Sequence, residues 1–92
     1  MVPHRLHVIV RGRVQGVGYR YATYRKAQAE GVSGWVRNLR DGAVEAEFEG
    51  DRETLAMILE WCGVGPPLSR VTEVTPTWSE GEQEYSGFEI RG

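Results

Sequence analysis

The chain has 92 residues, of which 40% are hydrophobic, so it can form one small domain with a two-layer core but not two separate cores. It has no apolar run of about 18 residues and no basic segment followed by an apolar one, so we expect neither a membrane protein nor a secreted one. The formal net charge is −2, but residues 1–40 hold eight basic residues and one acidic one, whereas residues 41–92 hold three basic and twelve acidic ones. The basic part either helps a small anion to bind or is only solvated, and charge alone leaves both explanations open.

The single cysteine, Cys62, cannot form an internal disulfide, and we expect a reduced, buried thiol. We therefore expect residues 1–92 to form a single domain that acts as a monomer in the cytoplasm.

The first predicted element is a strand from Arg5 to Val14. Apolar residues alternate with mostly polar ones along it, which places residues 6, 8, 10 and 14 on the core side. His4 and His7 on this segment are expected to point to opposite faces, which is poor geometry for binding one metal ion. We expect no metal site.

A glycine-rich loop follows, reading Gly-Arg-Val-Gln-Gly-Val-Gly-Tyr-Arg from Gly12 to Arg20. Gly16 and Gly18 let the backbone turn and aim successive N–H groups at one point, and the helix that begins near Arg20 adds its first-turn N–H groups. The planar guanidinium of Arg20 can hold two oxygens of a phosphate. The loop therefore predicts a phosphate site, although an isolated glycine pattern is more often a tight loop without a ligand.

The remaining elements follow from local patterns. A helix is expected from Arg20 or Tyr21 to Glu30, with Gly31 as its stop and one face formed by Tyr21, Tyr24, Ala27 and Gln28. Two strands, residues 34–39 and 44–49, flank a hairpin turn at Asp41-Gly42.

Asp51 can cap a second helix, which the segment with Gly63, Gly65, Pro66 and Pro67 ends. The residues expected on its core face are Leu55, Ile58, Leu59 and Cys62. A fourth strand is expected over residues 71–78, interrupted at Pro76 and at the edge of the sheet. A short last strand over residues 85–91 is expected to point Phe88 and Ile90 inward. The order predicts an α+β fold: a ferredoxin-like βαββαβ two-layer sandwich, with a mainly antiparallel sheet of four to five strands and two helices on one face.

The glycine loop and the segment Gly-Trp-Val-Arg-Asn-Leu-Arg-Asp-Gly, residues 34–42, together resemble the motifs of the acylphosphatase family. The resemblance runs from about Leu6 to Arg91. It implies that Arg20 binds phosphate, that Asn38 orients a water molecule, and that the phosphate cradle is the loop backbone of Gln15, Gly16, Val17, Gly18 and Tyr19. It also implies hydrolysis of small acyl phosphates to a carboxylate and inorganic phosphate, with no metal or cofactor. Tyr19 and Glu30 depart from the common pattern without touching the expected chemistry.

The residues themselves fit this activity. The leaving carboxylate has a conjugate acid with a pKa near about 4, so no general acid is needed. The protein then has to position the attacking water and to stabilise charge on the phosphoryl oxygens. An amide such as Asn38 can orient the water without being a base. Neither motif contains His or Glu, and the proposed cradle holds no Asp, so we expect the substrate phosphate itself to take the proton.

The sequence is also compatible with two other functions. An RNA-binding sheet could share this strand order, but we expect Glu45, Glu47 and Glu49 to point outward and repel nucleic acid. A phosphate sensor without turnover, as a domain of a larger maturation enzyme, is ranked lower because the chain ends where the domain does.

Overall fold

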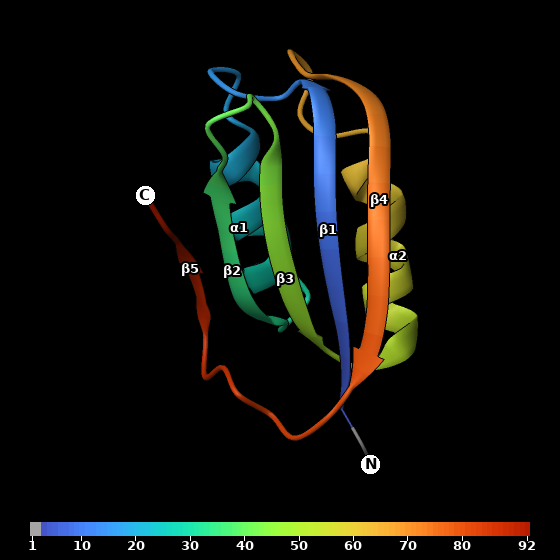
Figure 1. Cartoon of the computed structure of the whole chain (residues 1–92). Coiled ribbons are helices and arrows are strands. Elements are labelled where there is room, and N and C mark those ends of the chain that lie inside the picture. Colours follow the sequence, from blue (N-terminus) through green and yellow to red (C-terminus); the bar gives the residue numbers. More distant parts are fainter. Residues whose placement is uncertain (1–2) are drawn as a thin grey trace.

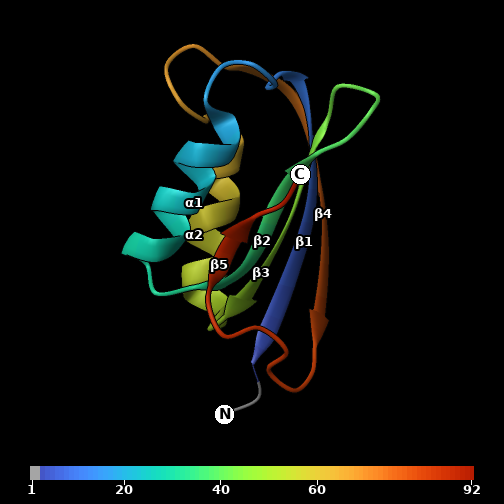
Figure 2. The same cartoon turned by 90° about the vertical axis from the view of Figure 1, so that its left-hand side faces the viewer.

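A computed structural model of the chain describes residues 3–92, which form one five-stranded sheet and two helices (Figure 1). The elements are β1 (His4–Arg13), α1 (Tyr19–Ala29), β2 (Ser33–Asn38), β3 (Val44–Gly50), α2 (Arg52–Cys62), β4 (Arg70–Glu80) and β5 (Phe88–Ile90). The sheet order is β4-β1-β3-β2-β5, with β5 parallel to β2 and the other pairs antiparallel. Both helices cover the same face of the sheet (Figure 2), so the predicted two-layer βαββαβ fold is confirmed.

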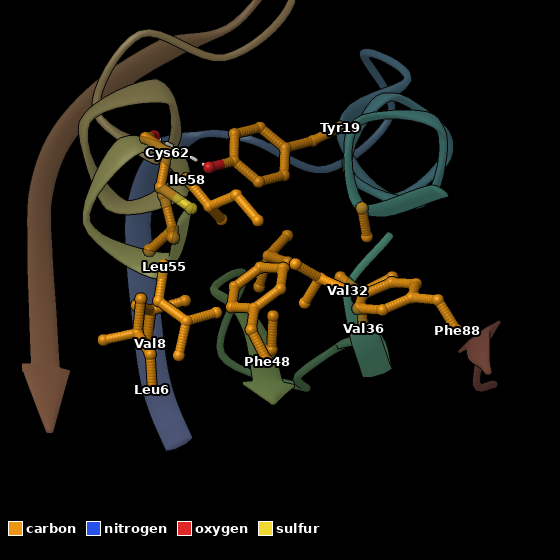
Figure 3. Close-up of a cluster of buried hydrophobic side chains, with 14 of the residues drawn as sticks. Leu6, Val8, Tyr19, Val32, Val36, Phe48, Leu55, Ile58, Cys62 and Phe88 are labelled. Atoms are coloured by element: carbon orange, nitrogen blue, oxygen red, sulfur yellow. Dashed lines mark hydrogen bonds between the residues drawn. The ribbon is translucent and has the colours of Figure 1, made fainter. Parts of the chain in front are cut away.

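The core lies between the sheet and the two helices (Figure 3). The alternation of β1 is confirmed, since Leu6, Val8 and Val10 are completely buried. They meet Phe48 of β3 and the apolar face of α2. Burying such side chains stabilises the fold by about 1.5–3 kcal/mol each before entropy is counted.

Helix α2 follows its sequence signals closely. The Asp51 carboxylate accepts a hydrogen bond from the Thr54 amide at 3.2 Å and so caps the helix. Leu55, Ile58 and Cys62 are buried as predicted. Burial raises the pKa of the Cys62 thiol to about 12, so this sulfur is not a nucleophile at neutral pH.

Helix α1 buries only part of the predicted face: Ala27 is buried and Tyr24 packs against the core. Its buried residues are Tyr19, Thr23 and Ala27, spaced four apart, whereas Tyr21 and Gln28 are exposed. Once Tyr19 faces the core, Tyr21 is turned about 200° away from it. Thr23 can be buried because its hydroxyl donates to the Tyr19 carbonyl at 2.8 Å. Gly31, at φ +70°, ends this helix region as expected.

Two details of the last strands also differ from the prediction. Strand β4 runs through Pro76 without interruption, because an edge strand does not need an N–H from every residue. The edge position predicted for Pro76 is confirmed. Strand β5 is only three residues long, and Ile90 is exposed although Phe88 is buried. Ile90 lies at the border of a pocket that the first residues of α1 also line.

The face of the sheet away from the helices carries paired charges. Glu45 accepts hydrogen bonds from Arg37 and from the ring of His7, and Glu47 is hydrogen-bonded to the Tyr85 hydroxyl. Glu49 also lies on this outward face as predicted, but it is only 3% exposed and so cannot repel nucleic acid as expected. It is covered because the segment before β5 folds over it.

Glu49 fixes that segment by hydrogen bonds. Its carboxylate accepts from the amides of Glu84 and Tyr85 at 2.9 and 3.0 Å, and from the Arg5 guanidinium at 3.1 Å. Although burial acts to raise it, the pKa of Glu49 is lowered by these donors. The buried carboxylate therefore sets the path by which the chain reaches β5.

Candidate active site

The glycine loop and the β2–β3 turn lie at the same end of the sheet (Figure 1), and a pocket of about 230 Å³ lies there. It is lined by Val14, Gly16, Gly18, Tyr19, Arg20, Tyr21, Asn38 and Ile90. The structure thus brings Arg20 and Asn38 together, although 17 positions separate them in the sequence. Gln15 and Val17, also expected in the cradle, are half-buried and are not among the lining residues.

The glycine loop needs glycine at two positions. Gly16 has φ +75° and Gly18 has φ +83°, a left-handed backbone that other residues rarely adopt. Gly18 is the N-cap of α1, and no side chain caps the helix and no acid lies in its first turn. The positive end of the helix dipole and its first amides therefore face the pocket without a competing carboxylate.

Tyr19 anchors the start of α1 in the core (Figure 3). Its hydroxyl donates to the Cys62 carbonyl at 2.7 Å, at the end of α2, and burial raises its pKa. Its ring also packs against Gly65, where a Cβ would come within 2.8 Å of a ring carbon. Only the main chain of Tyr19 is therefore free to take part in the expected cradle.

Gln15 joins the glycine loop to the β2–β3 turn. Its Nε2 donates to the carbonyls of Leu39 at 2.7 Å and Ala43 at 2.8 Å. Sequence reasoning gave Gln15 only a main-chain role, because nothing local to it indicates partners 24 and 28 residues away. The side chain holds the turn that follows Asn38 against the loop that precedes Arg20.

The side chain of Asn38, the last residue of β2, has an unsatisfied acceptor. Its Oδ1 is buried and accepts no hydrogen bond from any residue within 3–92. A buried amide oxygen without a donor is costly, by about 1–3 kcal/mol, and native proteins rarely leave one unless a ligand or water uses it. Asn38 itself lines the pocket beside Arg20, so its amide group lies next to that pocket.

Other charged residues considered for a site have partners outside this pocket. Arg37 donates to Glu45 at 2.6 Å and lies over the Trp35 ring, so it does not line the pocket. His4 and His7 contact different carboxylates, Glu80 and Glu45. In the described part of the chain, no three His, Cys, Asp or Glu side chains gather as a metal site would require. Neither helix there is long and apolar enough to cross a membrane.

A larger hollow, about 470 Å³, lies at the other end of the sheet, between β2, β3 and residues 83–87. Among the residues that line it, Glu49 is the one ionisable side chain, and its hydrogen bonds are already made within the protein. Within residues 3–92, this hollow therefore has no ionisable side chain that is free of partners.

Comparison with known proteins identifies the family. The acylphosphatase family model matches residues 6–90, which include the glycine loop and the Asn38 segment. The chain belongs to the acylphosphatase family. It is 49% identical over 86 residues to an acylphosphatase of Pelotomaculum thermopropionicum, covering 94% of both chains. It is 50% identical over 88 residues to one of Thermococcus kodakarensis, covering 96% of both.

The fold agrees with that assignment. The crystal structure of acylphosphatase from Bacillus subtilis superimposes with a TM-score of 0.93 at 37% identity, covering 97% of this chain and 99% of that one. The resemblance stated from the two motifs is thus confirmed at the level of the acylphosphatase family and of the fold.

Proposed function

We propose that the chain hydrolyses the carboxyl–phosphate bond of small acyl phosphates and releases a carboxylate and inorganic phosphate. Membership of the acylphosphatase family supports the reaction class. The observation that carries the assignment of residues is the buried, unsatisfied Oδ1 of Asn38 in a pocket shared with Arg20. Other parts of the proposal stay predictions: the chain forms a single domain, lies in the cytoplasm and is a monomer. It is also predicted to need no metal ion or cofactor.

Arg20 and the loop main chain hold the phosphoryl group in this proposal. The guanidinium presents a planar pair of donors to two phosphoryl oxygens. The amides of the loop from Gln15 to Tyr19, turned by Gly16 and Gly18, and the first amides of α1 complete the cradle. These donors are fixed before the substrate arrives, so they stabilise charge on the phosphoryl oxygens at no cost of reorganisation.

Asn38 positions the attacking water. Its Oδ1 accepts a hydrogen bond from the water, which aims the water oxygen at phosphorus opposite the carboxylate. The new phosphorus–oxygen bond forms as the bond to the carboxylate breaks, and the carboxylate leaves with that electron pair. No His, Asp or Glu lines the pocket in the part of the chain that the structure describes, so the released water proton passes to a phosphoryl oxygen.

The test is turnover of acetyl phosphate and benzoyl phosphate in EDTA. Asn38→Ala lowers kcat by about 100-fold or more while inorganic phosphate still inhibits, because the water loses its orientation but the cradle stays. Arg20→Gln lowers both turnover and phosphate affinity, and Arg20→Lys restores only part of them because an ammonium lacks the planar fork. Arg52→Gln, at an exposed arginine of α2 outside the pocket, is the control and keeps both.

Near-normal turnover by Arg20→Gln would overturn the residue assignment. Phosphate binding without any turnover by the unaltered protein would support the sensor alternative instead. RNA binding gains no support from the open sheet face, because Trp35 there is only 8% exposed, with the guanidiniums of Arg37 and Arg91 over its ring.

A further inference from the structure

The β2–β3 turn, residues 39–43, follows Asn38 directly, so the position of the turn affects where the Asn38 side chain lies. The register between β1 and β3 ends at the pair of Val10 and Val44, one residue past the turn. Beyond that pair, side chains join the turn to the strand that leads into the glycine loop. The turn therefore depends on specific side-chain contacts for its place at the site.

Asp41 makes one of these contacts. Its Oδ1 accepts a hydrogen bond from the Ala43 amide at 3.0 Å, which closes the turn on itself. Its Oδ2 accepts one from the Arg11 guanidinium at 2.8 Å. Arg11 lies on β1, immediately before Gly12, where the glycine loop begins. One carboxylate thus closes the turn and ties it to the strand from which the phosphate loop starts.

The contact depends on charge. The hydrogen bond from Arg11, together with the one from the Ala43 amide, holds the pKa of Asp41 below its usual value, so this carboxylate is ionised at neutral pH. The pair is open to solvent, with 47% of the Arg11 side chain and 52% of the Asp41 side chain exposed. Exposed ion pairs add little to overall stability and are screened by salt. We therefore expect its loss to alter the position of the turn more than the stability of the protein.

A second carboxylate near Arg11 provides a matched control. Glu73 of β4 is opposite Arg11 in the β1–β4 register and is exposed. Among residues 3–92, however, the carboxylate that accepts the hydrogen bond of Arg11 is that of Asp41. Replacing either carboxylate removes one negative charge close to Arg11, but only the Asp41 change breaks the contact with the turn.

We propose that Arg11 and Asp41 are positioning residues for the hydrolysis, because their ion pair holds the β2–β3 turn where Asn38 can aim the attacking water. This inference rests on the proposed function, which assigns the water to Asn38. Neither member of the pair is among the described residues that line the pocket. The pair therefore acts on kcat through Asn38 and leaves the binding of phosphate to Arg20 and the loop unchanged.

The experiment measures kcat for acetyl phosphate and inhibition by inorganic phosphate in the unaltered protein and in Arg11→Gln, Asp41→Asn and Glu73→Gln. Asp41→Asn keeps an oxygen for the Ala43 amide and removes only the charge. Each change in the pair lowers kcat by about threefold with phosphate inhibition unchanged, a size that suits an exposed ion pair. Glu73→Gln keeps both values, and Arg11→Lys keeps most of kcat because it retains the charge.

Two further measurements separate the ion pair from a general structural effect. The double variant Arg11→Gln with Asp41→Asn loses no more kcat than either single change, because the same contact is removed in each. Sodium chloride at about 1 M screens the pair and lowers kcat of the unaltered protein at saturating substrate, but has less effect on Asp41→Asn. An equal effect of salt on both proteins overturns the role of the pair.

Unchanged kcat in both Arg11→Gln and Asp41→Asn overturns the proposal, and so does an equal loss of kcat in Glu73→Gln, since the loss then follows net charge. Should the unaltered protein not hydrolyse acetyl phosphate, the proposed hydrolysis itself fails. Hydrogen exchange of the Ala43 amide, followed by NMR, then tests the hold on the turn without any substrate. Faster exchange in Arg11→Gln than in Glu73→Gln supports that hold, and equal exchange refutes it.

Discussion

Replacing Gln15 with methionine removes the link between the glycine loop and the β2–β3 turn while keeping the side chain's length. Two hydrogen bonds are lost, to the carbonyls of Leu39 and Ala43. Both carbonyls keep a second donor, since the Gly42 amide donates to Leu39 at 3.3 Å and the Leu39 amide to Ala43 at 2.8 Å. Neither acceptor is stranded, so the loss is about 1 kcal/mol for each bond, or about 2 kcal/mol in all.

Activity falls by more than the loss of stability implies. The turn follows Asn38 directly, and a displacement of about 1 Å in a positioning group can reduce turnover by about 100-fold. We expect kcat for benzoyl phosphate to fall at least tenfold in Gln15→Met at a temperature where the protein is fully folded. Urea unfolding followed by circular dichroism measures the stability, and Gln28→Met, at an exposed glutamine of α1, is the control.

The reasoning is refuted if Gln15→Met unfolds within about 0.5 kcal/mol of the unaltered protein, a difference expected for an ordinary surface substitution. Unchanged turnover in a clearly destabilised variant refutes only the positioning role. The unfolding free energy thus tests whether the Gln15 side chain stabilises the fold, and turnover tests whether it positions Asn38.

Three further changes test other contacts. Gly18→Ala costs about 1–2 kcal/mol of unfolding free energy from its φ of +83° alone, since a Cβ there meets no atom within 4 Å; an unchanged urea midpoint contradicts this. Tyr19→Phe lowers the free energy of unfolding by about 1–3 kcal/mol, because the buried Cys62 carbonyl loses its donor. Thermal unfolding measures this loss, and unchanged activity per folded molecule would show that the Tyr19 hydroxyl has a purely structural role. Because the pKa of Glu49 is lowered in the folded protein, its carboxylate stabilises the fold fully above the usual carboxyl pKa of about 4.3. This stabilisation is lost as the pH falls through the pKa of Glu49 in the folded protein. The difference in unfolding free energy between the unaltered protein and Glu49→Gln therefore shrinks from pH 7 to pH 3, and a difference independent of pH rules out the charge of Glu49 as its source.

Local patterns predicted the local structure well. The alternation of β1, the Asp51 cap and the apolar face of α2 each depend on neighbours within a few residues, and all three are confirmed. The face of α1 was predicted only in part: Ala27 and Tyr24 lie on the core side, but Tyr21 does not. Tyrosines occur on more than one side of that helix, and only packing in three dimensions selects Tyr19 over Tyr21.

The site was predicted in part for the same physical reason. Glycine spacing and an arginine at a helix start are local signals, so the pocket beside Arg20 could be anticipated. The side-chain role of Gln15 and the burial of Glu49 depend on partners 24 to 44 residues away. No sequence pattern encodes such distant hydrogen bonds.

The two outermost strands of the sheet have a consequence for behaviour at high concentration. Pro76 interrupts the row of free amides along β4, and β5 has only three residues, beginning with the buried Phe88, and the charged Arg91 follows it. Neither border is a good template for a strand from another copy, because continued pairing needs a long uninterrupted row of donors and acceptors. The native molecule is therefore protected against edge-to-edge aggregation at both borders.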